Sequence, residues 1–215
     1  MNVLVIGDVH GCFYTLKKLV KKHWNPNEEI LIQLGDLVNK GPHSAKCLKY
    51  WQKLEKKHAG KCVLLRGNHE QFLINNSKGL GDMITGKPLV YQLESAGISL
   101  KKTQAWLQEK PLFWKNDHLL VSHAGVGKQV DNPFNDSNKE GVLYQRGPLK
   151  CLDKTQVKGH NVLEGNKPVF NPAENAWYID TGAWVNKYLS AIRFTSQGKM
   201  LNIIREEVKG KDQVI

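Results

Sequence analysis

The chain opens with the sequence NVLVIGDVHG at residues 2–11, in which a short apolar run gives way at once to glycine and polar residues. A run of this length that ends in glycine is typical of a buried strand, which we expect at Val3–Gly7. The same arrangement returns twice, with strands expected at Glu29–Gly35 and Cys62–Arg66. Each of the three predicted strands therefore leads directly into a polar turn.

Helical patterns separate these strands. The segment 13–22 has its apolar side chains at helical spacing, a second helix is expected after Pro42, and a third from Glu70. Alternation of strand and helix predicts a parallel sheet with helices packed on it. The first seventy residues thus indicate an α/β architecture.

The rest of the chain is richer in strands. Residues 76–111 contain several chain-breaking glycines and predict a helical excursion, with a short helix at Gln104–Lys110. A long surface loop is expected at 125–141, where Gly, Asn, Asp and Pro are frequent. Further strands are expected at 112–114, 118–122, 156–159, 177–179, 189–195 and 200–205. We expect one domain over residues 1–207 and a frayed tail over residues 208–215.

Composition excludes several classes of protein. With 215 residues, 40% of them hydrophobic and 24% charged, the chain is typical of a globular domain and unlike a disordered or collagen-like protein. No apolar run approaches the roughly 20 residues of a membrane helix, and no secretion signal precedes Val3, so we expect a cytoplasmic protein without a membrane partner. The four cysteines form no CxxC pair, which argues against a thiolate metal site.

The net charge of +11 invites the hypothesis of a nucleic-acid partner. However, only four of the 31 basic residues are arginine, and the lysines are spread along the chain. Diffuse charge of this kind mainly affects solubility and encounter rates. We therefore expect no specific nucleic-acid binding, and the oligomeric state is left open.

Polar clusters follow the three N-terminal strands, at Gly7–Gly11, Gly35–Gly41 and Gly67–Glu70. The carboxyl ends of parallel strands lie together at one edge of a sheet, where ligands bind. Two more histidines, His123 and His160, end later strands. We therefore expect convergence at one edge of Asp8, His10, Asp36, Asn68, His69, His123 and His160.

This set of side chains offers oxygen and nitrogen donors but no sulfur. Such donors suit Mn, Fe or Zn in a reactive site rather than a structural zinc. The number of donors is sufficient for two divalent ions.

The three motifs Gly-Asp-x-His-Gly, Gly-Asp-x-Val-x-x-Gly and Gly-Asn-His-Glu resemble those of the calcineurin-like metallophosphoesterases, in particular the phosphoprotein phosphatase branch with its bacterial and phage Ser/Thr phosphatases. The resemblance extends from about Val3 to Arg193 and includes the turn His123-Ala124-Gly125 and the segment Asp180-Thr181-Gly182. It implies an α+β or α/β fold, a four-layer α/β/β/α metallophosphatase sandwich of two mixed β-sheets flanked by helices.

The resemblance also implies a binuclear metal centre, with manganese favoured and iron or zinc as alternatives. The implied ligands are Asp8 and His10 for the first ion, Asp36 as the bridge, and Asn68, His123 and His160 for the second. His69 is the implied general acid. Arg146, in the segment Tyr144-Gln145-Arg146, is implied to hold the substrate phosphate.

The implied reaction is metal-dependent hydrolysis of a phosphomonoester. Two metal ions lower the pKa of a shared water, and the resulting metal-bound hydroxide attacks phosphorus in line. The metal ions, Asn68 and Arg146 hold the equatorial oxygens, and His69 protonates the leaving group. The favoured substrate is a phosphorylated Ser/Thr protein, with a small phosphoester as the other class.

Two positions depart from the protein-phosphatase pattern. The second motif has Asn39 and Lys40 where those enzymes have Asp, which supports the acid histidine, and Arg, which contacts phosphate. Either these residues take over the two roles, or Asn39-Lys40-Gly41-Pro42 is only a turn. Glu70 likewise either belongs to the signature or only caps its helix at the N-terminus, where a carboxylate is favourable.

Symmetrical diadenosine tetraphosphate hydrolases belong to the same branch and also lack that Asp, so they are the alternative enzyme. A non-catalytic anion-binding module is the alternative of another class. The complete set of six metal ligands argues against the module, because a binding protein has no need of them all.

Overall fold

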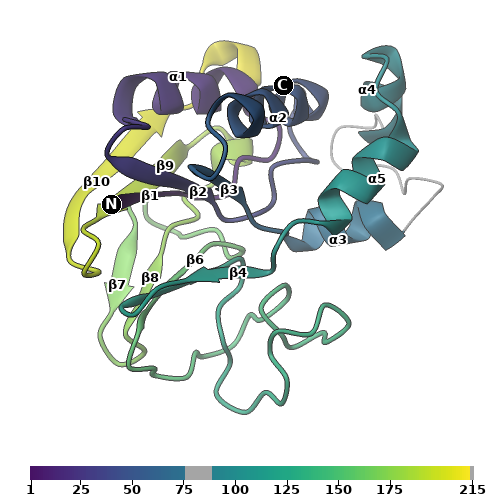
Figure 1. Ribbon diagram of the computed structural model, residues 1–215. Helices are drawn as coiled ribbons and strands as arrows, with labels where there is room; N and C mark the ends of the chain where they lie inside the picture. Colours follow the sequence, from purple (N-terminus) through teal and green to yellow (C-terminus); the bar gives the residue numbers. More distant parts are fainter. Residues whose placement is uncertain (76–88, 214–215) are drawn as a thin grey trace.

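The computed structural model describes residues 1–75 and 89–213, and in it two five-stranded sheets lie one above the other (Figure 1). The first sheet has the strand order β10-β9-β1-β2-β3 and the second the order β4-β5-β6-β8-β7. Both sheets contain parallel and antiparallel pairs. The expected fold of two mixed β-sheets flanked by helices is confirmed.

The first sheet is built around the predicted parallel strands. These are β1 (Asn2–Ile6), β2 (Glu29–Gln33) and β3 (Cys62–Leu64), and each ends one or two residues before the predicted boundary. The sheet is extended by β9 (Tyr188–Phe194) and β10 (Met200–Glu207), which pair antiparallel. The chain therefore leaves the sheet at the glycine-containing segments that carry the polar clusters.

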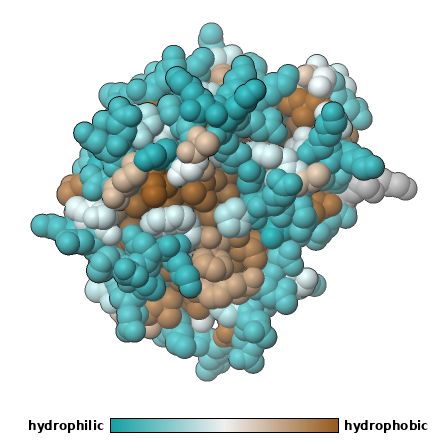
Figure 2. Space-filling model, in the orientation of Figure 1, coloured by the Kyte–Doolittle hydropathy of each residue, from teal (hydrophilic) through white to brown (hydrophobic). Residues whose placement is uncertain are grey.

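Two helices, α1 (Phe13–His23) and α2 (Ser44–Lys57), cover the outer face of the first sheet (Figure 1). Their apolar stripes, with Leu16, Leu19 and Trp51 fully buried, pack on the sheet. Lysines occupy the opposite, solvent-facing side, and Figure 2 shows hydrophilic side chains over this part of the molecule. Because these stripes are buried against the sheet, the helices hold the turns that precede them in place at its edge.

The second sheet holds β4 (Phe113–Lys115), β5 (Leu119–Ser122), β6 (Thr155–Lys158), β7 (Val169–Asn171) and β8 (Ala176–Tyr178). Strand β7 was not predicted, because it is a short edge strand whose Val169 and Phe170 are exposed. Between β5 and β6 runs the expected long loop, and Val126 and Val142 from this loop pack with Leu120 of the sheet.

A helical region lies at the end of the sandwich next to β3 and β4 (Figure 1). It contains α3 (Asn68–Asn75), α4 (Leu89–Ser95) and α5 (Leu100–Gln108). The last of these begins four residues before the expected Gln104, because Ser99 accepts a hydrogen bond from the backbone N–H of Lys102 and caps the helix there. The part of the expected helical excursion at 76–88 lies outside the described residues.

Residues 208–213 differ from the expectation of a frayed tail over 208–215. Val208 is buried in the core, and a short 3₁₀ helix, η2 (Gly210–Asp212), follows. The fully buried carboxylate of Asp212 accepts hydrogen bonds from the backbone N–H groups of Tyr14 and Thr15. These contacts bind residues 208–212 to the first turn of α1, and local sequence carries no signal for them.

Apolar side chains from both sheets fill the space between them. Val5, Ile32, Val157 and Ile192 are completely buried in this layer. Because the sheets share this core, loops at the ends of β1, β2 and β3 meet loops at the ends of β5 and β6. None of the described helices has the length and apolar content needed to span a bilayer.

Candidate metal centre

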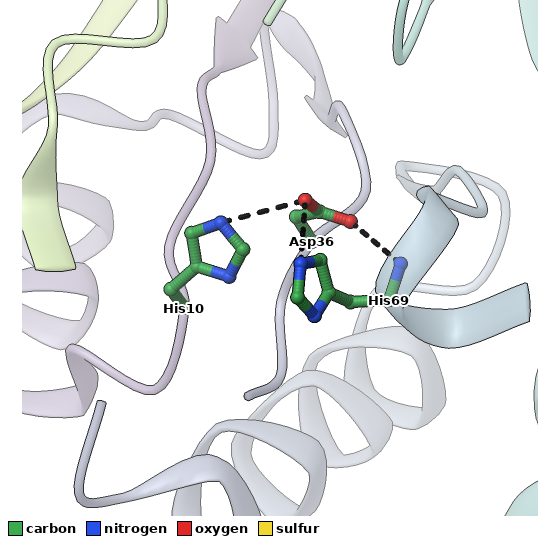
Figure 3. Close-up of side chains that lie close together, drawn as sticks. All are labelled: His10, Asp36 and His69. Carbon is green, nitrogen blue, oxygen red and sulfur yellow. Dashed lines mark hydrogen bonds and ion pairs between the residues drawn. The ribbon is translucent and has the colours of Figure 1, made fainter. Parts of the chain in front are cut away.

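Asp36 lies at the centre of the converging side chains (Figure 3). Its Oδ2 atom is 3.4 Å from Nε2 of His10, 3.4 Å from Nε2 of His123 and 3.9 Å from Nε2 of His69. Its other oxygen, Oδ1, accepts a hydrogen bond of 3.0 Å from the backbone N–H of His69. One carboxylate oxygen is therefore fixed by the backbone, while the other faces the histidines.

A second group of donors surrounds His123, which follows β5. Its Nε2 atom lies 2.9 Å from Oδ1 of Asn68 and 3.0 Å from Nδ1 of His160. Asn68 begins α3, and His160 follows β6. The first sheet and the second sheet thus each supply part of this group.

These donors fit divalent metal ions. The described residues contain two groups of potential ligands that share Asp36: one with His10 and His69, the other with His123 and His160. Bonds of about 2.1 Å at right angles place neighbouring ligand atoms about 3 Å apart, which is close to the spacings found here. The buried Nδ1 of His123 and Nε2 of His160 find no hydrogen-bond partner among the described residues.

The electrostatics of the cluster also favour a bound cation. Burial lowers the pKa of His10 and His123 well below the ordinary value, and burial together with Arg146 lowers that of His160 to about 3. Burial raises the pKa of Asp36 to about 7. Neutral imidazoles can bind metal, and a nearby divalent cation would stabilise the buried carboxylate in its ionised form.

Asp8 belongs to the same cluster but lies against the loop after β6. Its carboxylate accepts a hydrogen bond of 3.1 Å from the backbone N–H of His160. Burial and the nearby Asp180 raise its pKa well above the ordinary value. Asp180 is itself buried, and the Asp-Thr-Gly segment that contains it is a sequence signal for a further carboxylate at the centre, which the predicted set of site residues lacks.

The ring of His10 is oriented by its own loop. Its Nδ1 lies 3.0 Å from the carbonyl oxygen of Val38, to which it donates, so that the Nε2 lone pair faces Asp36. Orientation of an imidazole by a backbone carbonyl is common at metal sites. Lys40 lies next to the same ring nitrogen, with Nζ 3.0 Å from Nε2 of His10 and 4.6 Å from the centre of the Trp184 ring. The ammonium group of Lys40 therefore lies at the edge of the cluster.

Asn39 faces His69. The amide nitrogen of Asn39 lies 3.0 Å from Nδ1 of the His69 ring. Because an amide N–H donates, Nδ1 accepts this hydrogen bond, and a neutral ring then carries its proton on Nε2, toward the centre of the cluster. Asn39 thus contacts the acid histidine predicted from the sequence and also lies in a turn, with a φ angle of +68°.

Arg146 is exposed, and among the described residues its guanidinium makes no hydrogen bond or ion pair. Its positive charge lowers the pKa of both Asp36 and His160, which places it near the cluster. It is therefore available to an anionic group bound at the centre.

Backbone strain is concentrated in this region. Eight non-glycine residues among those described have a positive φ angle, and five belong to the predicted site: His10, Asp36, Asn39, Lys40 and His160. Such conformations cost roughly 1–3 kcal/mol each and persist where the surrounding structure enforces them, often at functional sites.

The comparisons with known proteins agree with this geometry. Residues 1–188 match the family of calcineurin-like phosphoesterases, and the chain belongs to that family. It is thereby a phosphoric ester hydrolase by class, of a family that uses divalent metal ions.

Among curated relatives, the chain is 27% identical over 215 residues to a symmetrical bis(5'-nucleosyl)-tetraphosphatase from Marinomonas sp. (strain MWYL1), covering 96% of this chain and 72% of the relative. It is 33% identical over 135 residues to a protein of the same name from Erwinia tasmaniensis, covering 61% of this chain. This second match spans only 47% of the relative, or about half its length.

Solved structures share the fold. One titled as a putative diadenosine tetraphosphatase has a TM-score of 0.64 and 22% identity, with 97% of this chain and 94% of that chain covered. A protein serine/threonine phosphatase from Saccharomyces cerevisiae has a TM-score of 0.70 and 17% identity, with 100% and 80% covered. At these identities the likeness concerns the fold alone.

Proposed function

We propose that this chain hydrolyses dinucleoside polyphosphates at a centre of two divalent metal ions, manganese being our first choice and iron and zinc the alternatives. The observation that carries the proposal is the contact of Asn39 with His69. Protein phosphatases have an Asp at this position of the motif, whereas the dinucleoside tetraphosphate hydrolases of the same branch lack it. The names of the curated relatives support the same choice.

The proposed ligands are those implied by the sequence motifs: Asp8, His10, Asp36, Asn68, His123 and His160. Metal ions bound there would lower the pKa of water and neutralise negative charge on the phosphate chain. The close spacing of Asp36 to His10 on one side and His123 on the other supports its place between the two ions.

The protein's own side chains have separate tasks in this proposal. His69 in its protonated form donates the Nε2 proton to the leaving oxygen and becomes neutral, and Asn39, which lies beside Nδ1, orients the ring. Arg146 and Lys40 bind non-reacting phosphate oxygens, because both are cations near the centre and Arg146 has no protein partner among the described residues. Asn68 serves both metal and phosphate.

A phosphoserine or phosphothreonine protein is the second candidate substrate. The exposed Arg146 supports it, because this arginine matches the phosphate-holding position of the protein-phosphatase motif.

A substrate panel with added Mn²⁺ tests the choice. We expect diadenosine tetraphosphate to be cleaved to two molecules of ADP, with a kcat/KM at least about 10-fold above that for phosphoserine and phosphothreonine peptides, a difference of about 1.4 kcal/mol in barrier. The same preparation of an Asp36→Asn variant serves as the control for contaminating hydrolases. Preference for the peptides would favour the second candidate, and hydrolysis of neither class would contradict both.

A further inference from the structure

Glu70, in the first turn of α3, is one of the completely buried carboxylates near the centre. Its Oε2 atom accepts hydrogen bonds from the backbone N–H of Asp36 at 2.6 Å and of Gly67 at 2.9 Å. Its Oε1 atom accepts from Leu37 at 2.9 Å and from Val38 at 3.2 Å. Within the described residues the carboxylate makes no ion pair, so backbone N–H groups provide its hydrogen bonds.

The four donors come from two loops that are about thirty residues apart in the sequence. Asp36, Leu37 and Val38 form the turn after β2, whereas Gly67 belongs to the turn after β3 that leads into Asn68 and His69. Glu70 is itself part of the second loop's helix. Its side chain therefore connects the backbone of one set of proposed ligands to that of the other, which is more than the capping of its own helix.

The connection bears directly on the orientation of Asp36. This residue has a φ angle of +54°, a conformation that costs energy for a non-glycine residue. The hydrogen bond from its N–H to Glu70, together with that from His69 to its Oδ1, holds it so that Oδ2 faces His10 and His123. Val38 is also held, and its carbonyl orients the His10 ring.

We infer that Glu70 is a positioning residue that holds the turn carrying Asp36 against the turn carrying Asn68 and His69. The inference rests on the proposed metal centre and adds a residue to it that contacts neither substrate nor metal. Glutamine has the same shape as Glu70 but should not be able to replace it. Its amide NH₂ group donates hydrogen bonds, and in place of a carboxylate oxygen it would face backbone N–H groups, which also donate. Aspartate keeps the charge but is one methylene shorter.

The test measures Mn²⁺ binding by isothermal titration calorimetry in wild-type protein, Glu70→Gln and Glu70→Asp. Loss of a residue that orients metal ligands typically lowers metal affinity by about 10- to 100-fold. We expect a loss in this range for Glu70→Gln and a smaller one for Glu70→Asp.

Asp212→Asn is the matched control. Asp212 is also completely buried and also accepts hydrogen bonds from backbone N–H groups, those of Tyr14 and Thr15, but it does not contact the proposed ligands. A general loss of stability should appear in both Asp212→Asn and Glu70→Gln when thermal unfolding is followed without metal. Only the Glu70 variants should lose Mn²⁺ affinity.

The outcomes separate this inference from the proposed function. If wild-type protein binds no Mn²⁺, the metal centre itself is wrong. If wild-type protein binds and Glu70→Gln binds equally well, or no more weakly than Asp212→Asn, Glu70 has no positioning role. Should Glu70→Gln fail to fold, Glu70→Asp decides in the same way, because unchanged affinity in that variant overturns the inference.

Discussion

The two oxygens of Asp36 have different surroundings, and this difference defines its proposed role. Oδ1 is occupied by the N–H of His69, whereas Oδ2 faces histidines from both groups of candidate ligands. A carboxylate placed in this way can bridge two ions, while each histidine can bind only one. Substitution of Asp36 should therefore cost more than substitution of a single histidine.

We expect Asp36→Asn to lower turnover at least about 10²-fold, which corresponds to about 3 kcal/mol in the barrier. This loss of turnover should be larger than the loss in His10→Ala. Turnover and metal content per chain, measured on the same samples, check this. A near-normal rate with two ions per chain in Asp36→Asn would show that Asp36 is not the bridge.

His69 is expected to matter most for substrates with poor leaving groups. A general acid contributes roughly 10²–10⁴-fold when the leaving oxygen needs a proton. His69→Asn should therefore reduce turnover strongly for an alkyl phosphate and much less for p-nitrophenyl phosphate, whose leaving group is already a weak base. Steady-state kinetics on both substrates measure the difference, and equal losses would assign His69 to phosphate or metal binding instead.

At the scale of elements, the turns after β2 and β3 approach each other so closely that only glycine fits at Gly67. A Cβ atom there would lie 2.2 Å from Oδ1 and 2.4 Å from the backbone nitrogen of Asp36. At Gly165, by contrast, an added Cβ would meet no atom within 4 Å. The two positions form a matched pair for testing how tightly the loops must pack.

We predict that Gly67→Ala destabilises the protein by about 3 kcal/mol, at the upper end of the cost of overpacking, and weakens Mn²⁺ binding because Asp36 is displaced. Gly165→Ala should change neither quantity appreciably. Denaturant unfolding and metal titration of both variants provide the measurement, and equal behaviour of the two variants would contradict the close approach.

Helix α1 is attached to strand β10 by a cluster of charges around Glu206. Its side chain is only 4% exposed and contacts Lys18, Lys22 and His23. Burial alone would raise the pKa of Glu206, but the hydrogen bonds from these three residues outweigh it and lower the pKa to about 2. Because the folded-state pKa lies below the ordinary value of 4.5, the cluster stabilises the folded state fully above about pH 4.5.

This stabilisation should be lost as the pH falls from about 4.5 to about 2. We expect the free energy of unfolding of Glu206→Gln to be about 2 kcal/mol below that of wild type at pH 7. This figure is reduced to allow for the solvent exposure of the lysines. The difference should vanish near pH 2. Urea unfolding at several pH values measures it. Glu207→Gln, at an exposed neighbour on β10, is the control, and a pH-independent difference for Glu206→Gln would contradict the prediction.

At the scale of the whole molecule, the candidate centre joins the two sheets. Asp8, His10, Asp36 and Asn68 follow strands of the first sheet, whereas His123 and His160 follow strands of the second. The unfolded chain does not hold these groups together, so metal should bind the folded state preferentially. Metal binding is therefore expected to oppose separation of the sheets.

Mn²⁺ at 100 times its dissociation constant should stabilise the protein by about 2.7 kcal/mol, which corresponds to about 5–10 °C in Tm for a chain of this size. Dialysis against a chelator should remove both this increase and the hydrolysis of p-nitrophenyl phosphate, and Mn²⁺ should restore them. Differential scanning calorimetry measures the increase in Tm, with the Asp36→Asn variant as control. Full activity of metal-free protein would contradict the dependence of hydrolysis on metal.

The sequence alone identified the three strand-end clusters and predicted the residues that the structure brings together around Asp36, but it did not include Asp180. This was possible because a buried strand, the glycine that ends it and the polar residues after it are local features, and parallel strands place their ends at one edge. The family and its class of reaction followed from the same motifs. That residues 1–207 form one domain stays a prediction.

Only the tertiary structure decided which distant groups meet. The contact of Asn39 with His69, three of the four backbone donors of Glu70, the position of Asp180 beside Asp8 and the attachment of Asp212 to α1 join residues that lie from about thirty to two hundred positions apart. Their pairing depends on how the sheets and helices pack, which local preference does not encode. A buried polar group must nevertheless find a partner, because an unsatisfied one costs about 1–3 kcal/mol, and packing determines which partner is within reach.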